Sequence, residues 1–295
     1  MAQTTWQKRW LPWMFCGPAL GAVGLLGVLP LLRTVYLSFT DARLSTLGSE
    51  KWLGFGNFTS LLVDPDWWRS VFNTLVFAAL SVSIETALGL VIALVLNRSF
   101  KGRGVLRATV LIPWAIPTVV SAKMWAWMFN DIYGVINELL LRTGIIHERL
   151  AWLADSKLAL LVVVAVDVWK TSPFMALLIL AALQGVPMSL YEAAALDGAS
   201  SLQRFFYVTW PLIKPGVWVA VIFRTLDALR VFDLPFVLTS NSKTTAVMSV
   251  FARQQMVEFQ DVGYGSAASV LVFLVIASIT LVYLARARGS LGLEA

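Results

Sequence analysis

Long apolar runs separated by shorter polar segments dominate this chain. A helix needs about 20 apolar residues to cross the roughly 30 Å hydrocarbon core of a bilayer. Backbone in lipid must also satisfy its own hydrogen bonds, which favours helices over strands. The pattern therefore predicts an all-α polytopic membrane protein, a single domain over residues 1–295 with six transmembrane helices. The six runs cover approximately residues 11–39, 72–96, 105–129, 158–183, 217–238 and 266–285.

Composition excludes a soluble protein with a single core. The 295 residues are 58% hydrophobic and 14% charged, and their mean hydropathy is +0.76. Cys16 is the single cysteine, so no intrachain disulfide can form, and one histidine among scattered acids predicts no metal site. The apolar run near the N-terminus continues far beyond the roughly 7 to 15 residues of a signal-peptide core, so we expect it to be a retained first helix.

Charge placement predicts the orientation. If the N-terminus is cytoplasmic, the inner segments are strongly basic, whereas the outer loops hold slightly more acidic than basic residues. By the positive-inside rule, both termini and the segment 187–215 then face the cytoplasm. The net charge of +6 reflects this topology and requires no nucleic-acid partner, and membrane lipid is the expected partner of the inner basic residues. These residues are Lys8, Arg9, Arg98, Lys101, Arg103, Arg107, Arg204, Lys214, Arg286 and Arg288.

The segment between the fourth and fifth runs contains two helix-start patterns. Ser189 and Glu192 have the spacing of a capping box, in which each side chain satisfies a backbone N–H at a helix start. Gly198 is the expected stop of this first helix, because glycine adopts the left-handed conformation without a Cβ clash. The residues between Glu192 and Gly198 include strong helix formers, so a short helix is predicted here.

A second short helix is predicted directly afterwards. Ser200 and Gln203 offer another capping box, and Pro211 is expected to end the helix. Phe205 and Phe206 contribute to one apolar face of this helix. Two capped helices hinged at a glycine between two membrane spans indicate a docking element for another protein.

The second and fourth predicted spans carry ionisable residues near their middle. A carboxyl at the depth of Glu85 either hydrogen-bonds neighbouring helices or serves transport, and the sequence leaves both alternatives open. Asp167 and Lys170 are three residues apart, so we expect them to neutralise each other. Pro173 is expected to interrupt the fourth helix, which is a common way to build a small-solute site in a membrane.

The fifth run has charges at strict three-residue spacing. Steps of three fall short of a full helical turn, so these side chains spiral around the helix with alternating sign and predict three successive ion pairs. They form either a structural ladder or the polar wall of a pathway. The four residues are Arg224, Asp227, Arg230 and Asp233.

Absent motifs narrow the mechanism. The chain has no G-x-x-x-x-G-K-[ST] phosphate-binding loop, no serine elbow and no zinc-binding histidine pair. We therefore expect a non-catalytic protein, a channel or transporter subunit whose energy source lies in another chain. The alternative is an ion-coupled secondary transporter that would use Glu85, Asp167 or the charges of the fifth run.

The segment 187–215 also carries a family resemblance. The stretch from Glu192 through Gly198 to Pro211 resembles the EAA loop of binding-protein-dependent ABC importer permeases, which reads E-A-A, three residues, G, nine residues, I-x-L-P. The spacing is kept, Val208 replaces the isoleucine, and Trp210 departs from the leucine. The DGAS and WKTSPF runs are similar to the sugar-importer branch of maltose and trehalose type.

The resemblance implies a type I ABC importer permease fold and a sugar substrate, a disaccharide or oligosaccharide. It also implies a prokaryotic cytoplasmic (inner) membrane location and four kinds of partner: a second homologous permease, two ATPase subunits, an extracytoplasmic solute-binding protein and the sugar. No cofactor is expected in this chain, because ATP and Mg would be bound by the ATPase subunits.

The resemblance further implies two groups of functional residues. The ATPase-coupling residues are Glu192, Ala193, Ala194, Asp197, Gly198, Phe205, Phe206 and Pro211. The substrate-pathway residues are Thr171, Phe174, Arg224, Asp227, Ala228 and Arg230.

Overall fold

The computed structural model describes residues 5–239 and 242–288, and these residues form helices joined by loops and turns without a β-strand. These residues divide into two compact units. The first unit contains residues 5–64 and 251–273. The second contains residues 65–239, 242–250 and 274–288.

The first unit begins with the long apolar run near the N-terminus. α1 and α2 are joined by a π-helical turn, so the run is one continuous helical segment, and its most apolar 18 residues bury no side chains. Asn57 donates to the carbonyls of Ser38 (3.0 Å) and Thr40 (2.8 Å), and the Tyr264 hydroxyl donates to Asp64 (2.7 Å). The helical segments that lie wholly in this unit are α1 (Thr5–Val23), η1 (Gly24–Val28), α2 (Leu29–Leu37), η2 (Leu44–Thr46), α3 (Gly56–Val63) and η4 (Gln254–Glu258).

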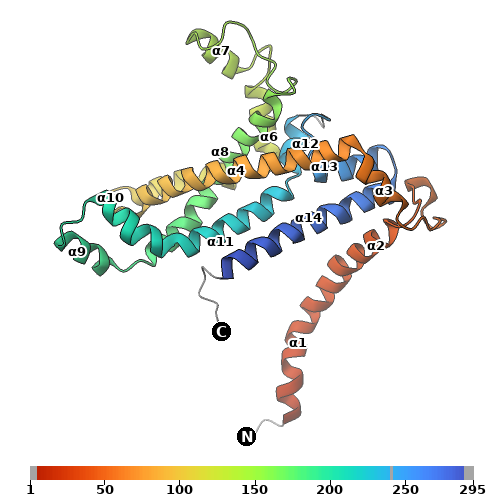
Figure 1. Ribbon diagram of the computed structural model, residues 1–295, viewed down its shortest axis with the longest axis horizontal. Coiled ribbons are helices and arrows are strands. Elements are labelled where there is room, and N and C mark those ends of the chain that lie inside the picture. Colours follow the sequence, from red (N-terminus) through yellow and green to blue (C-terminus); the bar gives the residue numbers. More distant parts are fainter. Residues whose placement is uncertain (1–4, 240–241, 289–295) are drawn as a thin grey trace. The chain divides into compact units, whose positions relative to one another are not determined.

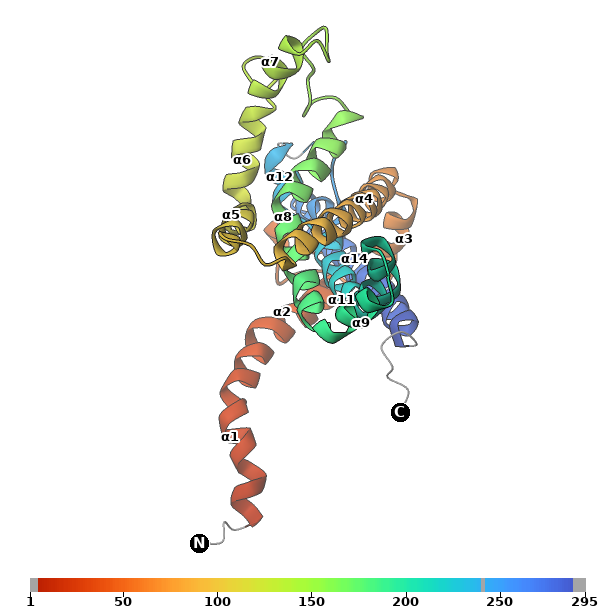
Figure 2. The same ribbon diagram turned by 90° about the vertical axis from the view of Figure 1, so that its left-hand side faces the viewer.

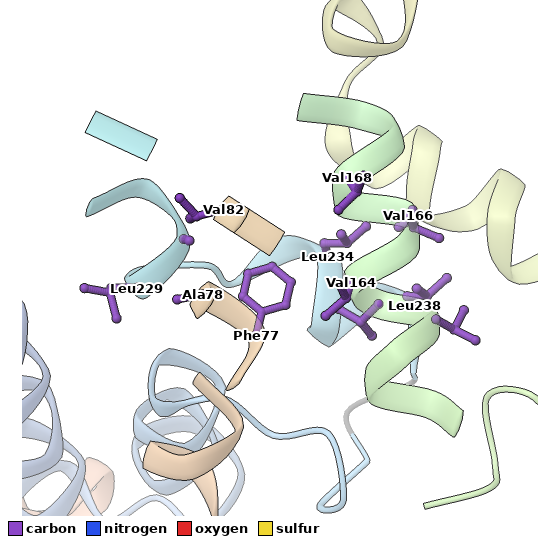
Figure 3. Packing of buried hydrophobic residues seen from close by; sticks show 13 residues of the cluster. Phe77, Ala78, Val82, Val164, Val166, Val168, Leu229, Leu234 and Leu238 are labelled. Atoms are coloured by element: carbon purple, nitrogen blue, oxygen red, sulfur yellow. The ribbon is translucent and has the colours of Figure 1, made fainter. Parts of the chain in front are cut away.

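Three long helices form the centre of the second unit. α4 (Pro65–Asn97), α8 (Leu158–Gln184) and α11 (Trp210–Leu229) pack side by side (Figures 1 and 2). Figure 3 shows Phe77 of α4 directed into an apolar core, close to Val164 of α8 and Leu234 of the short helix α12 (Asp233–Leu238). The remaining helices are α5 (Arg103–Ala115), α6 (Thr118–Met128), α7 (Val135–Arg142), α9 (Met188–Leu196), α10 (Ser201–Arg204) with the π-helical turn η3 (Phe205–Thr209), α13 (Met248–Arg253) and α14 (Val262–Arg288), of which α13 and α14 continue across the unit boundary.

Among the residues that the structure describes, five helical segments are long and apolar enough to cross a membrane, and the third predicted run differs from them. It consists of α5 and α6, which meet at an angle of 87°. Ile116 is extended (φ −70°, ψ 133°) and Pro117 precedes α6. A residue before proline is disfavoured in the helical conformation, and proline itself lacks the N–H that would continue the ladder.

The predicted interruption of the fourth helix is wrong. α8 runs unbroken through Pro173, which is buried. A missing backbone donor inside a membrane helix is tolerated where neighbouring helices pack around it. The third run, and not the fourth, is therefore broken at a proline, Pro117.

The fifth run also differs from its predicted extent of 217–238. α11 begins at Trp210 and ends at Leu229, and α12 is a separate helix that begins at Asp233. The four charges of this run therefore do not lie on one helix, which changes how they pair.

Candidate functional site

Each of the three central helices contributes one buried ionic side chain to a common network. Glu85 of α4 is fully buried, and Asp167 of α8 and Arg224 of α11 are nearly so. Arg224 Nε donates to Glu85 Oε2 at 2.6 Å and Nη2 donates to Oε1 at 3.1 Å, while Nη2 also donates to Asp167 Oδ2. The planar guanidinium suits this arrangement, because its fork can bond two carboxylates at once. One side chain thus ties α4, α8 and α11 together.

Two hydroxyls complete the network. Ser81 Oγ lies 2.9 Å from Glu85 Oε1 and 2.5 Å from Asp167 Oδ2, so it donates to one carboxyl or the other. Thr171 Oγ1 lies 2.6 Å from Glu85 Oε1. Buried charges are costly unless they are paired and hydrogen-bonded, and here each carboxyl has the guanidinium as a partner and at least one hydroxyl within hydrogen-bond distance.

The network continues along α11 toward a more exposed edge. Arg224 Nη1 donates to Asp227 Oδ2 at 3.3 Å, and Arg230 Nη2 donates to Asp227 Oδ1 at 3.2 Å. Two of the three predicted ion pairs therefore form. The third, between Arg230 and Asp233, is a wrong prediction because α11 ends at Leu229 and the helical spacing is lost before Asp233.

The expected pairing of Asp167 with Lys170 is also wrong. Asp167 pairs with Arg224, and the Lys170 ammonium donates to the carbonyl of Ile116. That carbonyl is released from the helical ladder by the break before Pro117, so it needs a donor from elsewhere. Lys170 supplies the donor and joins α8 to the bend between α5 and α6.

A cavity of about 520 Å³ lies beside the network. Ligand pockets for small molecules measure roughly 300–1,000 Å³, so its size suits a small solute. Both helix breaks contribute to its wall: residues 114–118 from the end of α5 to the start of α6, and residues 230–234 from the end of α11 to the start of α12. Asp167, Lys170 and Thr171 complete the wall together with charged residues of α11.

An aromatic stack supports one side of this cavity. Trp114 lines the cavity and stacks on Phe174, with ring centroids 5.4 Å apart and planes inclined by 12°. Phe174 also contacts Phe223, at a centroid distance of 5.8 Å. The cavity therefore combines one aromatic face with carboxylate, guanidinium, ammonium and hydroxyl groups.

The structure brings four of the six predicted pathway residues to the cavity wall: Thr171, Arg224, Asp227 and Arg230. Phe174 lies behind Trp114, and Ala228 is fully buried in the apolar core. Contact with a solute stays a prediction for all six.

The wall also contains Trp114, Asp167, Lys170 and Asp233, which the family resemblance does not assign to the pathway. The charges of the fifth run already made Asp233 a possible pathway residue, and Asp167 and Lys170 belong to the small-solute site predicted in the fourth run, so Trp114 is the residue that sequence reasoning missed. The ionisable or aromatic side chains of these residues inside apolar runs were a usable signal. What the sequence did not show is which of them face one another.

The coupling element begins differently from its prediction. α9 starts at Met188 after Pro187, so Ser189 lies inside the first turn and makes no capping box with Glu192. Pro187 is extended (φ −62°, ψ 133°) and occupies the N-cap position of α9, two residues before Ser189, the predicted N-cap. Gly198 has φ +78°, as expected for a glycine that follows a helix end.

The second capping box forms as predicted. Gln203 N–H donates to Ser200 Oγ at 3.3 Å, and Ser200 N–H donates to Gln203 Oε1 at 2.8 Å. Pro211 does not end this helix, which was a wrong prediction. α10 passes through η3 into α11, where Pro211 occupies the first turn and its missing N–H is tolerated.

Most of the predicted coupling residues are exposed, including Glu192, Asp197, Gly198 and Pro211. Phe206 is 55% exposed, whereas Phe205 packs against Phe206 and Trp210. Other large side chains of this element are also strongly exposed: Leu196, Tyr207, and Leu202, which belongs to the predicted apolar face with Phe205 and Phe206.

Comparison with known proteins shows which family this chain belongs to. Residues 85–288 match the family described as binding-protein-dependent transport system inner membrane component. The chain belongs to this family. Among its relatives is the trehalose/maltose transport system permease protein MalF of Thermococcus litoralis, 44% identical over 90% of each chain. The sulfoquinovosyl glycerol transport system permease protein SmoG of Agrobacterium fabrum is 39% identical, with 94% of this chain and 93% of the relative covered.

A solved structure shows the same fold. The bacterial alginate ABC transporter, crystallised with an alginate-bound periplasmic protein, contains a chain that matches with a TM-score of 0.85 at 22% identity. The match covers 98% of this chain and 99% of the other. The predicted all-α, multi-pass permease fold is confirmed. This permease is an inner membrane subunit of an ABC importer, which decides against the ion-coupled secondary transporter.

Proposed function

We propose that this permease imports a disaccharide or oligosaccharide and that the cavity beside Arg224 is the sugar site. The observation that carries the proposal is the composition of the cavity wall. Trp114 offers an aromatic face to a sugar ring, and Asp227 and Arg230 offer acceptors and donors to hydroxyl groups. Relatives named for trehalose, maltose and sulfoquinovosyl glycerol transport support a sugar as the solute.

The energy for import comes from partner subunits in this proposal. The chain has no phosphate-binding loop, so ATP and Mg would be bound by two ATPase subunits that dock on α9 and α10. A second homologous permease would complete the pathway, and an extracytoplasmic binding protein would deliver the sugar. The distribution of basic residues supports cytoplasmic termini and a cytoplasmic α9–α10 element.

Co-purification tests the partner arrangement. An affinity-tagged permease, extracted in mild detergent from cells that express its ATPase and permease partners, should retain both and should hydrolyse ATP. The same complex in proteoliposomes should accumulate radiolabelled disaccharide only with ATP and the binding protein present. A tagged permease that accumulates sugar without an ATPase subunit would contradict the proposal.

Substitution in the wall tests the sugar site. Asp227→Asn removes an acceptor charge at the cavity wall, and we expect uptake of the disaccharide to fall about tenfold or more, in line with the loss of a charged hydrogen-bond partner. Asp131→Asn changes an exposed carboxyl in the loop before α7 and should leave uptake unchanged. Equal uptake by the two variants would remove Asp227 from the site.

A further inference from the structure

A side-chain hydrogen bond joins the exposed helix α9 to the root of α11. The Tyr191 hydroxyl lies 3.0 Å from Thr209 Oγ1, and Thr209 is only 5% exposed. Thr209 Oγ1 also lies 3.4 Å from the Arg204 carbonyl, to which it can donate. The threonine oxygen is then free to accept from Tyr191. Both hydroxyls have partners, so this is a defined link.

α9 makes few other interactions that would fix its position relative to α11. Its residues are exposed or half-buried, and it is joined to α8 by a short turn and to α10 through Gly198 in the left-handed conformation. Within residues 5–239 and 242–288, Tyr191 makes the one side-chain hydrogen bond that joins α9 to another helical segment. Without it, the two hinges would leave α9 free to move relative to α11.

α11 extends from this link to the cavity. Thr209 closes the π-helical turn that leads directly into α11, and Arg224 lies on the same helix about 22 Å further along, at 1.5 Å per residue. The helix is also closely packed: a Cβ atom added to Gly216 would lie 2.6 Å from Ala182 Cβ of α8. We therefore expect a displacement of Thr209 to move α11 and, with it, Arg224.

We infer that the Tyr191–Thr209 hydrogen bond is a positioning link that makes α9 move together with α11. Movement of a docked ATPase subunit would pass from α9 through Tyr191 to α11, and along α11 to the Arg224 network at the cavity. The inference rests on the proposed function, because it needs an ATPase subunit on α9 and α10. Tyr191 and Thr209 are positioning residues and contact neither nucleotide nor sugar.

Hydroxyl deletions test the link in the reconstituted transporter. Tyr191→Phe and Thr209→Val should each lower the number of sugar molecules imported per ATP hydrolysed by about twofold to tenfold, the range that the net contribution of one hydrogen bond gives. The double variant should be no worse than either single variant, because both remove the same bond. Thr209→Ser keeps the hydroxyl and should restore the ratio.

Tyr133→Phe, an equal deletion on an exposed tyrosine of the loop before α7, is the control and should match the wild type. A wild-type ratio in both Tyr191→Phe and Thr209→Val, with the ATPase still co-purifying, would overturn the link and leave the proposed function intact. Additive losses in the double variant would also overturn it. Failure of the wild-type permease to bind an ATPase would instead overturn the proposed function.

Discussion

The coupling element and the Arg224 network hold their geometry by opposite means. In α9, α10 and η3 the shape comes from neighbours in the chain: Ser200 with Gln203, and the left-handed Gly198. In the network, Arg224 bonds Glu85, which is 139 residues away, and Asp167, which is 57 residues away. The first region is exposed and the second is buried.

The two regions are therefore sensitive to different kinds of substitution. A local cap in water contributes about 1 kcal/mol, and its loss is partly replaced by solvent. A buried ion pair that loses one member leaves a charge with no water to take its place, which costs about 3–5 kcal/mol. Substitutions in the network should therefore affect the assembly of helices, whereas those in the coupling element should affect its local order and its motion.

The largest expected effect is at Arg224. Arg224→Met keeps much of the side-chain volume but leaves Glu85 and Asp167 buried without their shared partner. We expect it to destabilise the permease by about 3–5 kcal/mol and to lower the midpoint of thermal unfolding in detergent. Combining it with Glu85→Gln and Asp167→Asn removes the unpaired charges and should recover much of the loss.

Arg230→Met is the matched control for stability. Its partner Asp227 is half-exposed and Arg230 is 68% exposed at the side chain, so the pair contributes at most about 1 kcal/mol. Similar unfolding midpoints for Arg224→Met and Arg230→Met would show that the network does not hold the three helices together.

The sequence predicted the coupling element better than the Arg224 network, because the contacts of the coupling element are between residues close together in the chain. Apolar runs locate the long membrane helices, and capping residues act within one turn, so Ser200 and Gly198 could be interpreted from the sequence. The partner of Asp167 was not, because Lys170 is near in sequence while Arg224 is near only after α8 and α11 pack. Spacing along one helix could not reveal a bond between helices.

The prolines also show that local sequence does not reveal contacts between helices. Pro117 and Pro173 both interrupt apolar runs, yet only the run with Pro117 is broken. Whether a missing backbone donor bends a helix depends on what packs around it, and on donors such as Lys170 that can satisfy the released carbonyl of Ile116. Neither the packing around a proline nor the presence of such a donor can be predicted from the local sequence.

An intermediate effect is expected at Gly198. A Cβ atom there would meet no other atom within 4 Å, so the cost of a side chain comes from φ +78° alone. Gly198→Val should strain the α9–α10 hinge by about 1–2 kcal/mol and uncouple ATP hydrolysis from uptake in proteoliposomes, whereas Gly198→Asn should be tolerated because asparagine enters this conformation more readily. Equal coupling ratios for the two variants would indicate that the hinge conformation does not matter for transport.

The smallest effect separates two serines that look alike in the sequence. Both Ser189 and Ser200 begin an S-x-x-E/Q pattern, but only Ser200 caps a helix, because Pro187 starts α9 ahead of Ser189. Ser200→Ala should cost the start of α10 about 1 kcal/mol, and amide hydrogen exchange in residues 201–204 should become about fivefold faster. Ser189→Ala should leave exchange in residues 188–196 unchanged. If Ser189→Ala speeds exchange in α9 as much as Ser200→Ala does in α10, the local cap does not explain the order of the coupling element, and packing against α11 must hold both helices.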